Sequence, residues 1–344
     1  MRPNAGPCAN GSVFLLNIMG YTGGLIALFT AVLWTASSLI FEYATKNGGV
    51  LNVNLLRGIV AIVFLVVTLF FVSGSLMPLY ADVRTWTWMC ISGIAGFVLC
   101  DICSFTAYGI ITARYTQLIM TLSPPISALM GWLMLGQRLS SLAGIGMILT
   151  LFGIGFSIFE RSDHEDNKTS SPHLIFPARG VILAIIAAIG QGSSVVFSKI
   201  GMDDYASSIE VLKKTADPSS NIFKLSQNGF YIPMSGTMMR MLAAVVCFTI
   251  FVYFRGGFKG FFTFLHDRKS AGLSGLGAFI GSYIGVILSL AALNYINAAV
   301  VSTILSTVPI LILLPDHFIN HRKVTARQIF GACVSVVGVA LFFL

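Results

Sequence analysis

Charged residues are scarce in this sequence. Asp, Glu, Lys and Arg make up 10% of its 344 residues, whereas soluble domains carry about 25%. Hydrophobic residues make up 56%, and the mean hydropathy is +0.86. Such a chain has too few polar residues to coat a soluble globule and is too apolar to be disordered. Its length suits about ten membrane-spanning helices of roughly 20 residues each, so we expect a polytopic, all-α membrane protein.

Several chemical signatures are also absent. The sequence contains no HExxH, Walker A or paired DxxxD motif, and five of its six cysteines lie inside apolar runs. We therefore expect no cofactor and no metal. The net charge is +8, but no basic stripe interleaved with aromatic residues indicates nucleic-acid binding. The basic residues flank apolar runs, where we expect them to contact lipid headgroups.

Long apolar runs are what the sequence does contain. They predict ten spans, at residues 20–44, 52–73, 86–109, 113–135, 141–159, 179–200, 237–255, 271–294, 298–318 and 325–343. Residues 1–19 form an amino-terminal tail, and residues 160–178 form a polar linker. A second polar stretch, 201–236, is an insertion in which we expect a short interfacial helix around Tyr205–Lys214.

The chain contains an internal repeat, residues 20–159 and 179–344. At an offset of 156 the matches are Gly24/Gly180, Ile26/Ile182, Ala31/Ala187, Ser37/Ser193, Ser38/Ser194 and Phe41/Phe197. At 183 they are Arg57/Arg240, Ala61/Ala244, Val63/Val246, Phe71/Phe254 and Gly74/Gly257. At 185 they include Gly96/Gly281, Ser104/Ser289, Pro124/Pro309, Gly146/Gly331 and Gly153/Gly338. The first change of offset places the insertion between the sixth and seventh spans.

Each repeat has five spans, so the second copy enters the membrane from the opposite side. The two halves are then inverted and related by a pseudo-two-fold axis in the membrane plane, a known basis for alternating access. The alternative is a duplication kept for structural reasons alone. We expect secondary transport. Because no ATP site is evident, uphill transport would draw on an ion or solute gradient.

Short motifs recur in both copies in the same order. The first copy carries Ala107–Tyr108, Leu122–Pro125 (LSPP) and Leu135–Ser140 (LGQRLS); the second carries Ala292–Tyr295 (ALNY), Pro309–Ile310 and Arg322–Thr325 (RKVT). Together they resemble tandem EamA domains of the drug/metabolite transporter superfamily over nearly the whole chain. Gln137 stands where that family usually has Glu. The resemblance implies ten helices, a central cavity lined mainly by spans 1, 3, 4, 6, 8 and 9, transport of small metabolites, and cytoplasmic termini.

Asp101 is the leading candidate for the mechanism, because an ionisable group deep in a span is costly and usually functional. It would contact a substrate amine or carry a coupling proton. The alternative is a structural tie to a neighbouring helix, for example through Arg114. The other polar candidates for substrate binding or coupling are Trp34, Ser38, Tyr108, Arg114, Gln117, Gln191, Ser194, Tyr283, Asn294 and Ser302.

Prolines mark a candidate hinge in spans 4 and 9. Pro124, Pro125 and Pro309 each free a backbone carbonyl, which is tolerated at midmembrane only against protein or a water-filled cavity. We expect peripheral roles for the charged residues near span ends. For Glu42 and Lys199 the alternatives are lining the mouths of the cavity and snorkelling to the interface, and we expect the second. Arg57 and Arg240 begin their predicted spans and are expected to set orientation or contact headgroups.

The function we expect is export of small, amino-acid-like metabolites across the cell (inner) membrane, with a proton or another ion as a coupling partner. Two other classes remain open. The GLSG segment around Ser274 matches a GxSG intramembrane protease, and Cys100 and Cys103 have CxxC spacing. A receptor or scaffold would instead use the 201–236 insertion to bind a partner. Charge bias around the loops opposes cytoplasmic termini.

Overall fold

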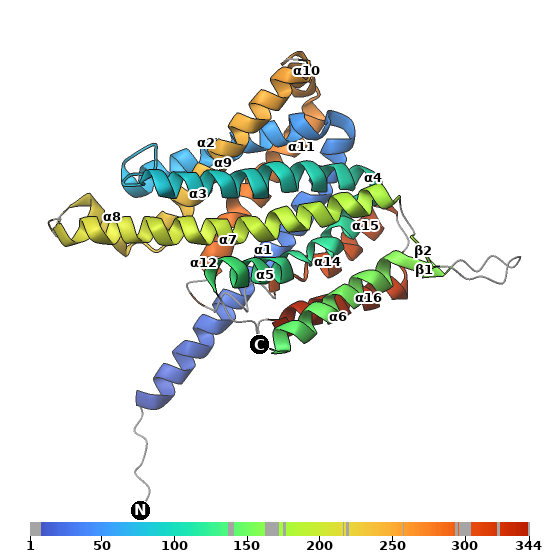
Figure 1. Cartoon of the computed structure of the whole chain (residues 1–344), viewed down its shortest axis with the longest axis horizontal. Coiled ribbons are helices and arrows are strands. Elements are labelled where there is room, and N and C mark those ends of the chain that lie inside the picture. Colours follow the sequence, from blue (N-terminus) through green and yellow to red (C-terminus); the bar gives the residue numbers. More distant parts are fainter. Residues whose placement is uncertain are drawn as a thin grey trace, which may run out of the picture.

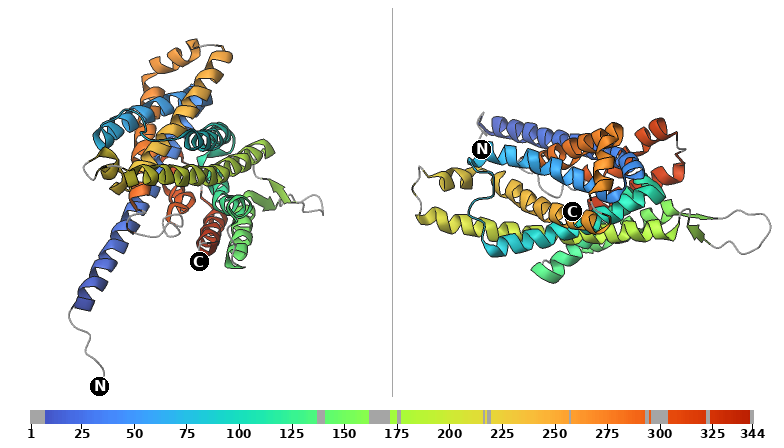
Figure 2. Two further views of the ribbon diagram at one scale, coloured as in Figure 1. Left: turned by 60° about the vertical axis from the view of Figure 1, so that its left-hand side comes forward. Right: turned by 90° about the horizontal axis from the view of Figure 1, so that it is seen from above.

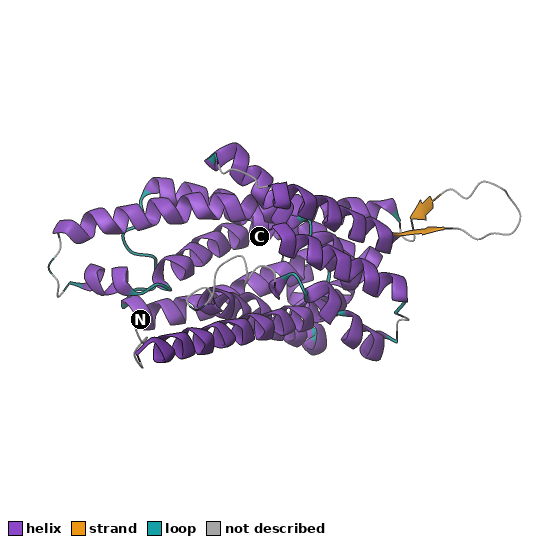
Figure 3. Cartoon of the chain, turned by 90° about the horizontal axis from the view of Figure 1, so that it is seen from below, coloured by secondary structure: helices purple, strands orange, loops and turns teal. Residues whose placement is uncertain are grey.

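The computed structural model describes residues 8–136, 141–161, 172–174, 177–215, 217, 220–256, 258–292, 295, 304–321 and 324–342. Over these residues the chain is a helical bundle with one short β-hairpin at its edge (Figures 1 and 3). Among them, six helices are long and apolar enough to cross a membrane: Tyr21–Gly48, Val50–Ser73, Val83–Met120, Ala178–Lys214, Tyr231–Phe254 and Arg268–Ser289. Shorter apolar helices are Gly144–Ser157, Val308–Ile319 and Ala326–Leu341.

The first half begins with two long helices joined at Gly49. Helix α1 runs over Cys8–Gly48 and α2 over Val50–Ser73. The backbone of α1 therefore starts well before residue 20, within the expected tail, and its first part extends away from the bundle (Figures 1 and 2). Gly49 has φ 79° and Gly74, after α2, has φ 70°, a conformation that glycine adopts without steric cost.

The remaining elements of the first half are interrupted helices. They are α3 (Val83–Gly93), the π-helix η1 (Ile94–Leu99), α4 (Cys100–Met120), α5 (Ser123–Leu135) and α6 (Ser141–Ile158). Within α4, Thr112 has φ 73° and ψ 160°, so the helix kinks between Ile111 and Ala113. The kink falls between the predicted third and fourth spans. Strands β1 (Phe159–Arg161) and β2 (Pro172–Leu174) then pair antiparallel within the predicted polar linker.

The second half repeats much of this order. It comprises α7 (Ala178–Thr215), α8 (Asn221–Gln227), α9 (Tyr231–Phe254), α10 (Lys259–His266), α11 (Arg268–Gly277), the π-helix η2 (Ala278–Gly285), α12 (Val286–Ala292), α14 (Val308–Leu311), α15 (Leu313–Asn320) and α16 (Ala326–Phe342). The separate interfacial helix expected around Tyr205–Lys214 is wrong, because α7 continues through that segment without a break. The hairpin and α8 lie at opposite ends of α7 (Figure 1).

The two π-helices occupy equivalent places in the repeat. Adding the offset of 185 to η1 gives residues 279–284, which lie inside η2. Each π-helix packs against the first long helix of the other half: a Cβ on Gly190 of α7 would lie 2.8 Å from Ala95 O of η1, and one on Gly285 of η2 would lie 2.8 Å from Trp34 Cδ1 of α1. π-Helical segments are rare and occur often at functional sites. The hydrophobic periodicity of the sequence does not reveal these π-helices.

Helices α6 and α16 lie side by side and antiparallel (Figure 1). A Cβ added to Gly153 would meet the Gly331 carbonyl at 2.6 Å, and one added to Gly338 would meet the Gly146 carbonyl at 2.7 Å. In lipid the hydrophobic effect does not drive helices together, because lipid tails are as apolar as the side chains. Helices associate there through small residues that let their backbones approach closely. These four glycines are the repeat-equivalent pairs of the sequence.

Candidate functional site

A buried ion pair joins helices α2 and α4. Arg57 Nη1 lies 2.8 Å from Asp101 Oδ2, and both residues are buried. Arg57 Nε donates to Ser282 Oγ of η2 at 2.8 Å, so the arginine links the two halves of the chain. The rings of Phe41, Phe97 and Phe105 surround the guanidinium at 5.4–5.8 Å. An ion pair held away from water in this way is costly to build and marks a functional candidate.

Two sequence expectations about this pair were wrong. Arg57 was expected near a span end against headgroups, but it is the eighth residue of α2 and is buried. Arg114 was one suggested partner of Asp101, but its Nε lies 3.5 Å from Asp316 Oδ2 of α15. Asp316 is fully buried. Partners so far apart in the chain cannot be identified from spacing on one helix.

Arg240, the repeat partner of Arg57, also lies inside the bundle. It is the tenth residue of α9, because that helix begins at Tyr231 and not at 237 as predicted. Its Nη2 donates to Ser194 Oγ at 3.0 Å, and its guanidinium lies 4.6 Å from the ring centre of Phe97. The expectation of a headgroup contact for Arg240 is therefore wrong as well.

Three of the predicted site residues form one hydrogen-bonded chain. Gln117 Nε2 donates to Ser38 Oγ at 2.7 Å and to Tyr108 Oη at 3.0 Å. Tyr108 stacks on Phe105, which lines the ion pair. Trp34 is half-buried beside them: its carbonyl accepts from Ser38 Oγ, and its Nε1 donates to the Gly281 carbonyl at 3.2 Å. Spans predicted from the sequence to line one cavity thus bring these polar groups together.

Glu42 closes the kink in α4. Its Oε2 accepts a hydrogen bond from Ala113 N at 2.9 Å, where the helix restarts after Thr112, and its Oε1 pairs with Lys46 at 2.7 Å. A carboxylate is well placed at a helix start, where unpaired N–H groups carry partial positive charge. Glu42 is only 3% exposed, so the expectation that it snorkels to the interface is wrong.

The prolines stand where helices restart after a break. The chain turns at residues 121–122 and again at the equivalent residues 306–307. Pro124 and Pro125 then lie in the first turn of α5, and Pro309 lies in the first turn of α14. Proline suits this position because it lacks the N–H that a helix start leaves unpaired. Both halves therefore have a helix break at the same place, and the hinge role of the prolines stays a prediction.

The remaining candidates are spread more widely. Ser194 is fully buried and exchanges hydrogen bonds with Ser92, which fits a packing role. Tyr283 stacks on Phe64 of α2, and its hydroxyl lies 2.5 Å from Thr68 Oγ1. Gln191 lies on α7 and is partly buried. Asn294 and Ser302 lie outside the described residues.

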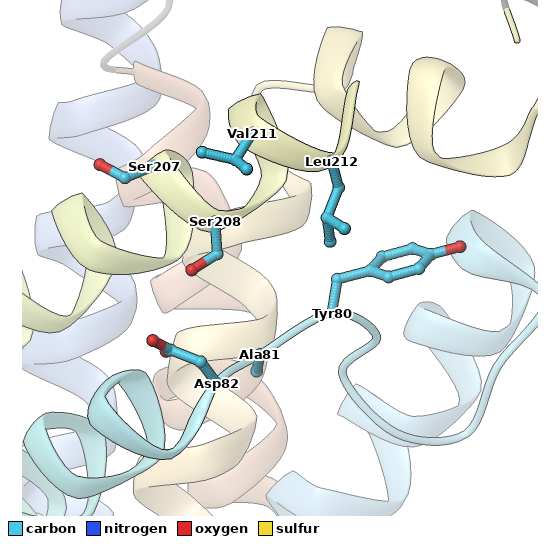
Figure 4. A pocket seen from close by; sticks show the side chains of 7 residues that line it. All are labelled: Tyr80, Ala81, Asp82, Ser207, Ser208, Val211 and Leu212. Carbon is cyan, nitrogen blue, oxygen red and sulfur yellow. The ribbon is translucent and has the colours of Figure 1, made fainter. Parts of the chain in front are cut away.

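The residues of the alternative functions are also buried. Ser274 of the GLSG segment is fully buried in α11, and Cys100 and Cys103 pack in an apolar cluster against α7. An open groove lies elsewhere, between the loop before α3 and the far end of α7 (Figure 4). It is lined by Tyr80, Ala81, Asp82, Ser207, Ser208, Val211 and Leu212. None of the predicted site residues lines this groove.

The apolar helices and the buried charges between them define a multi-pass membrane protein. The model of the EamA-like transporter family matches residues 21–159 and 222–344. The chain therefore belongs to the EamA-like transporter family, with two tandem copies, and the resemblance seen in the sequence is confirmed. Membership makes it a membrane transporter of the drug/metabolite superfamily.

Two further comparisons were made, with the curated proteins and with the solved structures. Comparison with the curated proteins finds no match. A solved chain, titled only as the crystal structure of a protein, is similar with a TM-score of 0.53 and 12% identity. The similarity covers 93% of this chain and 96% of that one. At this identity the similarity shows a shared overall fold and nothing about substrate.

Proposed function

We propose that this chain is a secondary transporter that exports small, amino-acid-like metabolites by alternating access. In this proposal ten spans form two inverted five-helix repeats around a midmembrane site. The cell (inner) membrane is the proposed location. In this proposal the kink at Thr112 is the boundary between the third and fourth spans.

The contacts between α6 and α16 carry the proposal. A pseudo-two-fold axis that exchanges the repeats converts residue 153 into 338 and residue 331 into 146. The close contact of Gly153 with Gly331 therefore has its own counterpart in the contact of Gly338 with Gly146. Contacts that exchange in this way are typical of an isologous, two-fold interface. The antiparallel direction of the two helices favours inverted over parallel repeats.

The π-helices and the helix breaks are the places where we propose that the conformation changes. π-Helices η1 and η2 and the proline-marked breaks occur at matching positions in the two halves. Non-helical backbone at membrane depth is tolerated where it faces protein or a water-filled cavity. If the two halves exchange conformations, one site opens to each side in turn.

The ion pair is the proposed coupling element. Asp101 breaks the repeat, because its equivalent position is Val286. A group that folding alone required would be expected in both halves. Asp101 can release Arg57 and bind a proton or a substrate amine instead. Breaking this ion pair would then be linked to the side of the membrane to which the site opens.

Flux measurements on the full chain in proteoliposomes test the proposal. We expect metabolite flux that Asp101→Asn abolishes or makes insensitive to pH, and that Ser274→Ala leaves unchanged. Loss of an activity on Ser274→Ala alone would favour the protease. Wild-type flux and unchanged pH dependence in Asp101→Asn would contradict the coupling role. Absence of flux for every metabolite offered would favour the receptor or scaffold.

A further inference from the structure

Arg240 differs from the other two arginines near the site, Arg57 and Arg114, in having no ion pair among the described residues. Arg57 faces Asp101 at 2.8 Å, and Arg114 faces Asp316 at 3.5 Å. Among the residues that the structure describes, no carboxylate forms an ion pair with Arg240. Arg57, Asp101 and Arg240 together carry two positive charges and one negative charge in a region removed from water.

The repeat shows which position could have held a carboxylate for Arg240. Arg57 and Arg240 are equivalent residues, but the position equivalent to Asp101 holds Val286. One half of the protein therefore supplies its own carboxylate to the arginine, and the other half does not. An arginine without an ion-pair partner in a membrane span is costly, and ionisable residues in spans mark substrate or ion pathways.

The surroundings of Arg240 leave hydrogen-bonding capacity unused. Its Nε is enclosed, and no acceptor among the described residues lies within hydrogen-bond distance of it. Gly96 of η1 lets the guanidinium lie close to that helix, since a Cβ at this position would lie 3.2 Å from Arg240 Nη2. Ser194 accepts from the same Nη2, and the Phe97 ring covers the guanidinium. The Nε–H of Arg240 is thus unpaired beside an Nη2 that makes one hydrogen bond, to Ser194. The planar guanidinium fork is the group that binds carboxylates and phosphates most readily.

We propose that Arg240 binds the anionic group, a carboxylate or a phosphate, of the transported metabolite. The inference rests on the proposed transport function and narrows it to anionic cargo. Arg240 lies about 14 Å along a helix of about 36 Å, so the bound group would sit near the middle of the membrane. Cargo bound there would complete in the second half the ion pair that Asp101 makes in the first.

The experiment uses the full chain in liposomes and a mixture of matched probes. Glutamate and glutamine form one pair, and glucose 6-phosphate and glucose form another; each pair differs in one anionic group. Liposomes without protein give the background, and mass spectrometry of the washed contents gives the uptake of each compound. The same measurement is made on Arg240→Gln, Arg240→Lys and Arg255→Gln. Arg255 is a matched control because it is exposed at the end of the same helix.

We expect the anionic member of at least one pair to accumulate in preference to its neutral partner. Arg240→Gln should lower that uptake at least about tenfold, since hydrogen bonds to charged groups are among the stronger ones. Arg240→Lys should retain more uptake than Arg240→Gln, and Arg255→Gln should match wild type.

Three results would overturn the inference. Accumulation of the neutral members alone would refute anionic cargo and leave the transport function standing. Anion uptake by Arg240→Gln at the wild-type rate would refute the role of Arg240. Failure of every probe to accumulate would count against both proposals. If Arg240→Gln does not fold, the preference of the wild-type protein and the uptake by Arg240→Lys still decide the question.

Discussion

Replacing Asp101 by Asn separates the structural and functional contributions of the buried ion pair. The substitution keeps the side-chain volume and removes the charge, which leaves the Arg57 guanidinium without its carboxylate at 2.8 Å. Removing one partner of a buried ion pair typically costs about 3–5 kcal/mol. We expect the lower end of that range, because Arg57 keeps its hydrogen bond to Ser282 and its ring contacts.

The double variant Arg57→Met/Asp101→Leu is the informative comparison. Replacing both members of a buried pair by apolar residues of similar volume is often neutral or stabilising, by about 1–4 kcal/mol. We therefore expect the double variant to regain the unfolding free energy that Asp101→Asn loses. If the pair serves transport, metabolite flux should stay lost although stability returns.

The free energy of unfolding is measured on the purified full chain, with the helical circular dichroism signal monitored during denaturation. Lys199 and Asp203 provide a control, since their side chains are 53% and 60% exposed and their ion pair is 2.9 Å long. Asp203→Asn should cost less than about 1 kcal/mol, as exposed pairs do. A cost of Asp101→Asn no larger than that of the control, or full flux in the double variant, would refute this reasoning.

Other substitutions probe separate parts of the structure, each measured as a change in unfolding free energy. Gly153→Ala should cost about 1–3 kcal/mol by overpacking against the α16 backbone, whereas Gly144→Ala, with open space around it, should not destabilise; equal effects would contradict the close contact. Thr112→Gly should stabilise by about 1 kcal/mol, because φ 73° strains a β-branched residue; destabilisation would argue against the kink. Asp82→Ala should cost about 0.5–2 kcal/mol by removing the cap of α3. The Thr85 hydrogen bonds hold the pKa of Asp82 below its usual value, so this contribution is present at neutral pH and is lost as the pH falls through that lowered pKa; a pH-independent effect would be inconsistent with it.

The sequence predicted the helical segments well, because membrane spans depend on local composition. Where the structure describes them, the ten apolar runs correspond to helical segments. The prolines expected to interrupt spans 4 and 9 lie in the first turns of α5 and α14, and their role as a hinge stays a prediction. The count of ten membrane crossings stays a prediction. The sequence did not predict the π-helices or the β-hairpin. A π-helix differs from an α-helix only in its i→i+5 hydrogen bonds, and the hairpin lies in a short polar linker.

The site was predicted less completely. Ser38, Tyr108 and Gln117 were named and lie together, but their hydrogen-bonding partners were not identified. Arg57 and Arg240 were misjudged because the start of α9 was placed six residues late and the depth of Arg57 in α2 was underestimated. The repeat-equivalence of these two arginines was the signal that could have drawn attention to them.

Labelling from the two sides of the membrane tests the inverted arrangement most directly. Leu76, after α2, and Lys259, at the start of α10, are repeat-equivalent at the offset of 183, and both are exposed. Leu76→Cys and Lys259→Cys, each in a background without the six native cysteines, would be treated with a membrane-impermeant maleimide in right-side-out and inside-out vesicles. We expect the two positions to react from opposite sides. Reaction of both from the same side would contradict inverted repeats and the alternating access built on them.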